Sequence, residues 1–152
     1  PINDTNARAV FLGMTMDTTR ADMTQAMLEG VAFALRDSVE IARSLGLDIS
    51  RSTLCGGGSR SPLWRTILAN VLGIPLDLPA TEQGPGYGAA LLALVACGRY
   101  RNVAEVSRAM LHIQATVQPD PELTALYDAR YAEFKQIYPA CRPLFASLAG
   151  TP

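Results

Sequence analysis

The stretch 52–73 constrains the fold more than any other part of the chain, because it reads as a strand, a bare glycine turn and a helix in immediate succession. Residues 52–55 have the character of a short strand, and glycines 56–58 leave no side chains in the way of an approaching ligand. Ser61 is a good helix N-cap and Pro62 suits the first helical position, so the stretch predicts a β-turn-α unit.

Such a unit presents free backbone N–H groups and the positive end of a helix dipole to an anion, which is how many folds hold a nucleotide phosphate. Three glycines after a strand also fit a flexible turn that binds nothing, and the spacing alone leaves both interpretations open. A Walker loop is excluded, because no Gly-Lys-Ser or Gly-Lys-Thr follows and the one lysine of the chain is Lys135.

The rest of the chain alternates strands with helices, which indicates the α/β class. A long helix is predicted from Thr19, which forms a capping-box-like pair with Asp22, to a stop at Gly46. Gly30 inside it suggests that another element packs closely there. The face that we expect to be buried has apolar steps of three and four and consists of Met23, Ala26, Met27, Gly30, Val31, Ala34, Leu35, Ser38, Ala42 and Leu45.

Shorter elements follow the glycine turn. We expect strands at 74–78 and 113–117, helices at 62–72, 87–97 and 103–110, a last helix that starts at Pro121 and is interrupted at Pro139, and a strand or buried turn at 9–14. Three clear strands are few for a free-standing sheet, so we also expect the chain to be a piece of a longer protein.

Composition narrows the function classes. A length of 152 residues suggests one domain, and a net charge of −1 gives no indication of a nucleic-acid or membrane-surface partner. No apolar run is long enough to span a bilayer. Cys55, Cys97 and Cys141 fit no zinc or disulfide pattern, which favours a reduced, cytoplasmic chain. With His112 as the single histidine, neither a His-based triad nor a zinc site is expected.

A second glycine pattern is a decoy. The run from Gly84 to Ala89 matches the loose Gly-x-Gly-x-x-Gly/Ala dinucleotide pattern, with Glu105 at about the right distance downstream. Glu105 falls in a helical pattern, however, and the strand before Gly84 ends several residues too early. We therefore expect this helix start to pack tightly against a neighbouring loop or nucleotide.

Four ordered motifs resemble the FGGY carbohydrate kinases. Residues 9–14, followed after seven residues by 22–29, fit the C-terminal signature of that family. Residues 56–64 resemble its adenosine-binding motif, and residues 82–90 resemble the start of its next helix. The tail 127–145 resembles the usual end of these chains. Within the family the xylulokinases look most similar, and glycerol, ribulose and gluconate kinases share much of the pattern.

The resemblance implies an actin-like, ribonuclease-H-like ATPase fold, with 1–152 as part of the nucleotide-binding C-terminal lobe, truncated at its N-terminal side, and helices packed on a small sheet. It implies an ATP-dependent sugar kinase, with D-xylulose as substrate, Mg²⁺ on the phosphates and the sugar held by the missing lobe. The catalytic aspartate of the family lies upstream of Pro1, so neither a catalytic nor a metal-binding residue is expected in this chain. Asp4, Asp22 and Glu29 are expected to be structural.

For the nucleotide site, the resemblance implies that Gly57 and Gly58 approach the ribose and α-phosphate through their backbone. Ser59 or Ser61 would add a hydroxyl, at or near a position where some relatives have asparagine, and 84–87 would border the adenine. We expect the piece alone to be inactive. Two alternatives stay open: a non-catalytic lobe that forms a homodimer through surface that missing strands would cover, and a relative that has lost activity.

Overall fold

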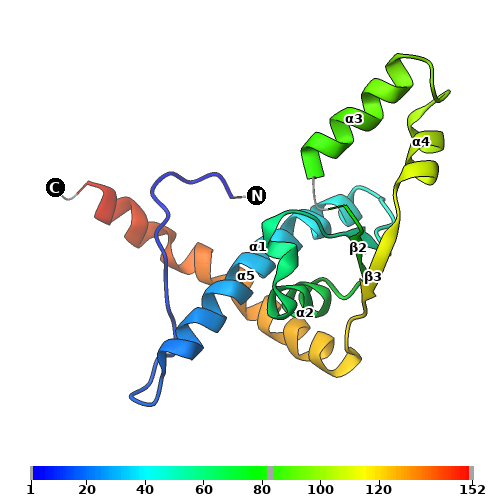
Figure 1. Ribbon diagram of the computed structural model, residues 1–152. Helices are drawn as coiled ribbons and strands as arrows, with labels where there is room; N and C mark the ends of the chain where they lie inside the picture. The colour runs from blue at the N-terminus through cyan, green and yellow to red at the C-terminus, as the bar shows by residue number, and fades with distance from the viewer. Residues whose placement is uncertain (1, 82–83, 151–152) are drawn as a thin grey trace.

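The described residues, 2–81 and 84–150, form five α-helices, one short 3₁₀ helix and three strands in the computed structural model (Figure 1). In chain order the elements are α1 (Arg20–Ser44), β1 (Ser52–Thr53), η1 (Gly57–Arg60), α2 (Pro62–Leu72), β2 (Leu76–Pro79), α3 (Gly84–Ala96), α4 (Val103–Met110), β3 (Ile113–Val117) and α5 (Pro121–Ala149).

The strands form one mixed sheet with the order β1-β2-β3. The first two strands are parallel and pair Ser52 with Leu76, whereas β2 and β3 are antiparallel and pair Leu76 with Val117. The central strand β2 is the most buried of the three. Beyond its end, the N–H of Ala80 donates to the carbonyl oxygen of His112 at 2.8 Å, so the chain leaves and re-enters the sheet at one point.

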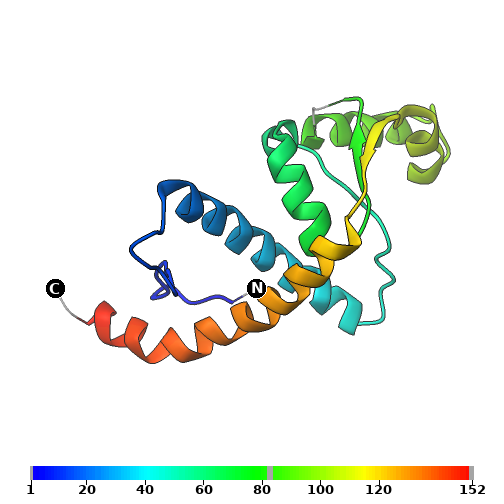
Figure 2. The ribbon, with the colours of Figure 1, turned by 90° about the horizontal axis from the view of Figure 1, so that it is seen from below.

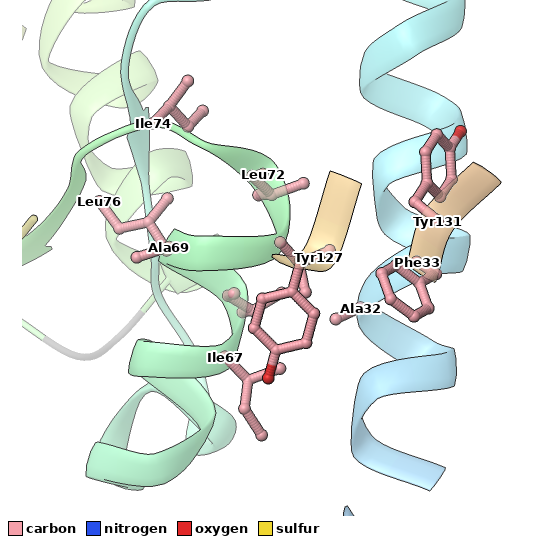
Figure 3. Close-up of a cluster of buried hydrophobic side chains, with 11 residues drawn as sticks. Ala32, Phe33, Ile67, Ala69, Leu72, Ile74, Leu76, Tyr127 and Tyr131 are labelled. Atoms are coloured by element: carbon pink, nitrogen blue, oxygen red, sulfur yellow. The ribbon is translucent and has the colours of Figure 1, made fainter. Parts of the chain in front are cut away.

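The core lies where α1, α2 and α5 meet β2. Six consecutive residues of α2, from position 67 to 72, are buried. Phe33 of α1 packs against Tyr127 and Tyr131 of α5, with ring centroids 6.0 and 5.9 Å apart, and Figure 3 shows Tyr127 between α1 and α2. These elements, α1, α2, α5 and the sheet, are called the body below.

Much of the predicted secondary structure is confirmed. The helices at 62–72 and 103–110 and the strand at 113–117 have the predicted bounds, and Thr19 and Asp22 form the capping box of α1. Three other elements have bounds that differ from those predicted. Strand β1 has only two residues, β2 starts two residues later than predicted, and α3 starts at Gly84, three residues earlier.

Two other predictions of secondary structure are wrong. Residues 9–14 form neither a strand nor a buried turn, and Leu12 is 80% exposed. Helix α5 continues through both Pro139 and Pro143, and Figure 2 shows it as one curved helix. Proline removes one intrahelical hydrogen bond, and curvature of the surrounding helix accommodates that loss.

The predicted buried face of α1 is also wrong. Val31 and Leu35 of that face are 55% and 45% exposed, whereas Ala32 and Phe33, one step around the helix, are buried against α2 and α5. The sequence misleads because the packed side of α1 carries charged groups that find partners only in three dimensions. Arg36 donates to the carbonyl oxygen of Val71 at 3.0 Å and pairs with Asp128 of α5 at 2.6 Å. A Cβ at Gly30 would meet nothing within 4 Å, so no element packs closely there.

Helices α3 and α4, residues 84–110, form an arm that extends away from the body (Figure 1). Among the described elements, α4 is the one against which α3 packs extensively. The sequence of α3 contains no charged residue, yet Leu91 is its single buried residue among those described and Leu92 is 58% exposed. The arm therefore presents an apolar helix that this chain leaves largely uncovered.

Candidate functional site

The predicted strand, glycine turn and helix are present between β1 and α2. Gly56 has a φ of 87°, a left-handed value that glycine adopts without strain, and it redirects the chain into η1. Ser61 then caps α2, because its side-chain oxygen accepts a hydrogen bond from the N–H of Trp64 at 3.3 Å, and Pro62 occupies the first helical position. The local sequence thus specifies both the turn and the start of the helix.

Ser59 closes the turn from inside. Its backbone N–H and its hydroxyl both donate to the carbonyl oxygen of Gly56, at 3.0 and 2.6 Å, and its side chain is buried. The N–H of Ser61 donates to the carbonyl oxygen of Gly58 at 3.1 Å. The two predicted hydroxyls, of Ser59 and Ser61, are therefore both bonded to the backbone of the turn and its helix.

Gly57 and Gly58 lie on the exposed side of the same turn. A Cβ at Gly57 would meet nothing within 4 Å, whereas one at Gly58 would lie 3.2 Å from the indole of Trp64. In the part of the chain that the structure describes, neither backbone N–H has an acceptor. The turn thus offers two backbone donors at exposed positions that have no acceptor among the described residues, which is the arrangement that anion-binding turns use.

A pocket of about 320 Å³ lies beside the turn, between the ends of β1 and β2 and the start of β3. Its walls include Cys55, Ser59, Arg65 and Gln114, and Arg65 is the single charged residue among them. The Nε of Arg65 donates to the carbonyl oxygen of Ser59, which connects α2 to the turn. Among the described residues, the pocket therefore combines apolar and polar walls with the positive charge of Arg65.

The start of α3 reaches the same place. A Cβ at Gly84 would lie 3.8 Å from the sulfur of Cys55, so this glycine brings the arm against the residue that precedes the turn. The hydroxyl of Tyr87 donates to the carbonyl oxygen of Met110 at 2.8 Å and ties α3 to the end of α4. Of the motif 82–90, residues 82 and 83 lie outside the described residues.

Asp4, Asp22 and Glu29 each accept a hydrogen bond from a side chain of this chain. The hydroxyl of Thr19 lowers the pKa of the Asp22 carboxyl, and the hydroxyl of Tyr138 on α5, 2.7 Å away, lowers that of Asp4. Glu29 accepts hydrogen bonds from the hydroxyl of Tyr127 at 2.9 Å and from Arg130 at 3.3 Å. Asp22 therefore caps α1, Glu29 joins α1 to α5, and Asp4 joins the N-terminal segment to α5.

Other candidate residues have structural partners too. In α4, Glu105 accepts a hydrogen bond from the N–H of Arg101 at 2.9 Å, so it serves the helix start rather than a ribose. No group of three or more His, Cys, Asp or Glu side chains within 2–81 and 84–150 is arranged to hold a metal ion. The helices of that same part of the chain are too short or too polar to cross a membrane.

A larger pocket, of about 560 Å³, lies between α1 and α5. The charged groups on its walls have partners within the protein, and that of Lys135 is the ring of Tyr131, 4.9 Å away. Arg36 pairs with Asp128, and the hydroxyl of Tyr131 donates to Asp37 at 2.6 Å. Burial and this carboxylate raise the pKa of Tyr131. We assign this pocket to helix packing, because its polar groups already serve one another.

Arg65 is the residue of the candidate site that the sequence analysis missed. A signal was present, because a positive side chain near the N-terminus of a helix opposes the helix dipole and therefore needs another reason to be there. Arg65 stands four positions after the N-cap Ser61. Its partner, the carbonyl oxygen of Ser59, became visible only in the folded turn.

Comparison with known proteins agrees with this geometry. A profile of the C-terminal domain of the FGGY family of carbohydrate kinases matches residues 1–97. The xylulose kinase of Staphylococcus epidermidis is 30% identical over 148 residues, which are 97% of this chain and 30% of that protein. The xylulose kinase of Escherichia coli is 34% identical over 147 residues, which are 96% of this chain and 30% of that protein.

The crystal structure of xylulose kinase from Rhodospirillum rubrum matches the fold with a TM-score of 0.80 and 32% identity, over 92% of this chain and 28% of that one. This confirms the expected fold class, the C-terminal lobe of an actin-like ATPase fold. The chain spans about 30% of the length of the curated relatives it matches. The profile match covers well over half of the chain, and the chain therefore belongs to the FGGY family of carbohydrate kinases.

Proposed function

We propose that the protein containing this chain transfers the γ-phosphoryl group of ATP to a hydroxyl of D-xylulose. Membership of the FGGY family supports phosphoryl transfer to a carbohydrate, and the relatives named xylulose kinase favour this sugar over ribulose, glycerol or gluconate. The observation that carries the nucleotide half of the proposal is the glycine turn, whose exposed Gly57 and Gly58 have N–H groups without an acceptor among the described residues. Because the chain spans under a third of its relatives, the activity is that of a whole protein of which 1–152 is the C-terminal, nucleotide-binding lobe.

In this proposal Gly57 and Gly58 contact the ribose and α-phosphate through their backbone. Backbone N–H groups and a helix start stabilise negative charge without adding a mobile side chain. Ser59 and Ser61 complete the site. Their hydroxyl oxygens already bind the backbone of the turn, so we assign them mainly to holding its shape.

The remaining chemistry falls outside this chain. Phosphoryl transfer depends on positioning, charge neutralisation and a base for the attacking hydroxyl. Asp4 and Asp22 are bound to Tyr138 and Thr19, which leaves them unsuited as that base. The described residues offer no carboxylate cluster for Mg²⁺, so we assign none of them to it. The piece alone is accordingly inactive and binds nucleotide weakly, because little offsets the cost of immobilising the ligand.

The direct test is ADP production by the whole protein with Mg²⁺-ATP and a panel of D-xylulose, ribulose, glycerol, gluconate and L-rhamnulose. We expect turnover with D-xylulose above the other sugars. Turnover with another sugar would change the substrate but keep the reaction. A folded protein that produces no ADP with any of them would overturn the proposal in favour of an inactive relative.

Gly57→Val tests the site itself. A branched side chain there points into open space, so the fold is expected to tolerate it while the approach of the phosphates is blocked. We expect loss of ADP binding by the whole protein in calorimetry. Gly30→Val is the matched control, because a Cβ at Gly30 also meets nothing within 4 Å but lies on α1, outside the candidate site. Unchanged ADP affinity in Gly57→Val would place the nucleotide elsewhere.

A second candidate, a lobe that forms a homodimer without catalysis, is favoured by the uncovered apolar surfaces. Met27, Val31 and Leu35 of α1 and Leu92 of α3 are all more than 40% exposed. Large exposed apolar patches mark association sites. Light scattering of the 152-residue chain tests this candidate, and a monomer at all concentrations would contradict it. We place either form in the cytoplasm, consistent with free Cys55, Cys97 and Cys141.

A further inference from the structure

We propose that Arg65 is the positioning residue of the glycine turn: it anchors the end of the turn at Ser59 to α2 and so holds the turn in the shape that leaves Gly57 and Gly58 exposed. This inference rests on the proposed function, since the N–H groups of these glycines matter only if the turn binds a nucleotide. It deepens that function by naming a side chain that no motif of the sequence pointed to.

A hydrogen bond joins Arg65 of α2 to the end of the glycine turn. The turn is short, and α2 begins right after it. Arg65 lies in the first half of α2, six residues after Ser59 in the sequence. Its Nε donates to the carbonyl oxygen of Ser59. A charged donor makes a stronger bond than a neutral one, so the contact fixes this carbonyl to the helix.

Two other carbonyl oxygens of the turn also accept hydrogen bonds. The carbonyl oxygen of Gly56 accepts from Ser59, and that of Gly58 accepts from the N–H of Ser61. With Ser59 held by Arg65, the carbonyl groups at 56, 58 and 59 are all engaged on the protein side. A peptide plane whose C=O is fixed has its attached N–H fixed as well, because the peptide bond is planar. The fixed planes carry the N–H groups of Gly57, Ser59 and Arg60, and the bond from Arg65 fixes the last of them, so that it joins the end of the turn to α2.

The side chain of Trp64, the neighbour of Arg65 in α2, also lies against the turn. Its indole lies where a Cβ at Gly58 would come within 3.2 Å. Two successive residues of α2 thus hold the turn, Trp64 by packing and Arg65 by a hydrogen bond. Arg65 is only partly buried and lines the pocket beside the turn, so it stands outside the hydrophobic core cluster. Replacing it is expected to alter the turn and to leave the core intact.

Two substitutions separate positioning from charge. Arg65→Gln places its amide nitrogen the same number of bonds from Cα as the Nε of arginine, so the donor is kept and the charge is removed. Arg65→Met has similar length and removes both. We expect Arg65→Met to raise the KM for ATP of the whole protein about tenfold, with little change in kcat, and Arg65→Gln to restore it to near the starting value.

Hydrogen exchange in the absence of nucleotide provides the readout that is independent of the proposed function. The amides of Ser59 and Ser61 are protected by bonds within the turn, and we expect Arg65→Met, but not Arg65→Gln, to speed their exchange about tenfold. Amides in the middle of α5 serve as the internal control. If the starting protein fails to bind ATP, the proposed function fails while this measurement still decides the role of Arg65.

The KM and hydrogen-exchange measurements together decide the role of Arg65. Rescue by Arg65→Gln in both measurements supports positioning. If Arg65→Gln is as impaired as Arg65→Met in KM, the guanidinium acts by its charge and the proposal is overturned. Unchanged exchange in both variants overturns it as well. Should Arg65→Met fail to fold, faster exchange of Ser59 and Ser61 in Arg65→Gln alone is sufficient to reject the proposal.

Discussion

The body and the arm use apolar residues in opposite ways. In α2 of the body, the run from 67 to 72 is buried without interruption, although it includes a polar residue, Asn70. In α3 of the arm, thirteen residues without a charge leave only Leu91 buried among those described. A helix that is apolar all round is normally enclosed. The difference shows that amino-acid composition and burial within this chain are matched in α2 and mismatched in α3.

Asn70 shows how the body accommodates a polar group. Its side-chain oxygen accepts a hydrogen bond from the N–H of Asp120 at 2.7 Å, and Asp120 in turn caps α5. A buried polar group with a partner costs little, whereas one without a partner is expensive. The body therefore tolerates polar residues through specific bonds, and the arm makes few such bonds with the body.

The largest expected effect contrasts a truncation in each region. Phe33→Ala removes a ring that packs on Tyr127, Tyr131 and Phe134, and should lower the free energy of unfolding by about 3–5 kcal/mol. Leu92→Ala removes an exposed side chain and should change it by less than about 0.5 kcal/mol. Urea titration of both variants measures the contrast. A large loss in Leu92→Ala would mean that the surface of the arm is covered in solution, as in a homodimer.

A smaller effect is expected from the polar link between α1 and α5. Burial and the neighbouring Glu29 raise the pKa of the Tyr127 hydroxyl from 10.0 to about 12. The folded state thus retains this proton more strongly than the unfolded state, and stability that is present below pH 10 is lost as the pH rises toward 12. Tyr127→Phe should lower stability by about 1–2 kcal/mol at pH 7 and flatten this alkaline loss. Urea unfolding between about pH 9 and 12 measures this. An equal loss of stability with rising pH in the starting protein and in Tyr127→Phe would contradict the role of the Tyr127 hydroxyl.

The smallest expected effect is a gain. Gly30 lies within α1 with nothing near its missing Cβ, so Gly30→Ala should raise stability by roughly 0.5–1 kcal/mol through helix propensity. Gly73→Ala is the control with the opposite sign, because Gly73 has a φ of 64° and a Cβ there would lie 3.2 Å from Thr124. Thermal unfolding of the pair measures both. Destabilisation by Gly30→Ala would indicate that something does pack against this side of α1.

Local sequence signals predicted the elements of the fold well. Ser61, Pro62 and Gly73 bound α2 as expected, and Asn102 caps α4. Those signals act within a few residues, so no knowledge of the tertiary structure is needed to interpret them.

The failures arose where tertiary partners decide the outcome. The packed side of α1 carries Arg36, whose burial depends on Val71 and Asp128. Likewise, the glycine turn was predictable as a unit, whereas the bond from Arg65 to Ser59 depends on the path that the turn takes back toward α2. Periodicity finds apolar stripes, but it does not identify which polar groups will be satisfied on folding.

The hydrogen bond between Ala80 and His112 has a consequence for how this protein can vary in evolution. This bond closes the end of the β2–β3 ladder, whose pairs run from Leu76 with Val117 to Pro79 with Ile113, so the whole arm is one excursion between two fixed anchor points. Lengthening an excursion whose ends are already joined costs little, since closure entropy grows only slowly with length. Past the first turn of α3, residues can therefore be inserted or removed without shifting a single pair in the sheet, and descendants of one ancestor can differ there in size while keeping the same body.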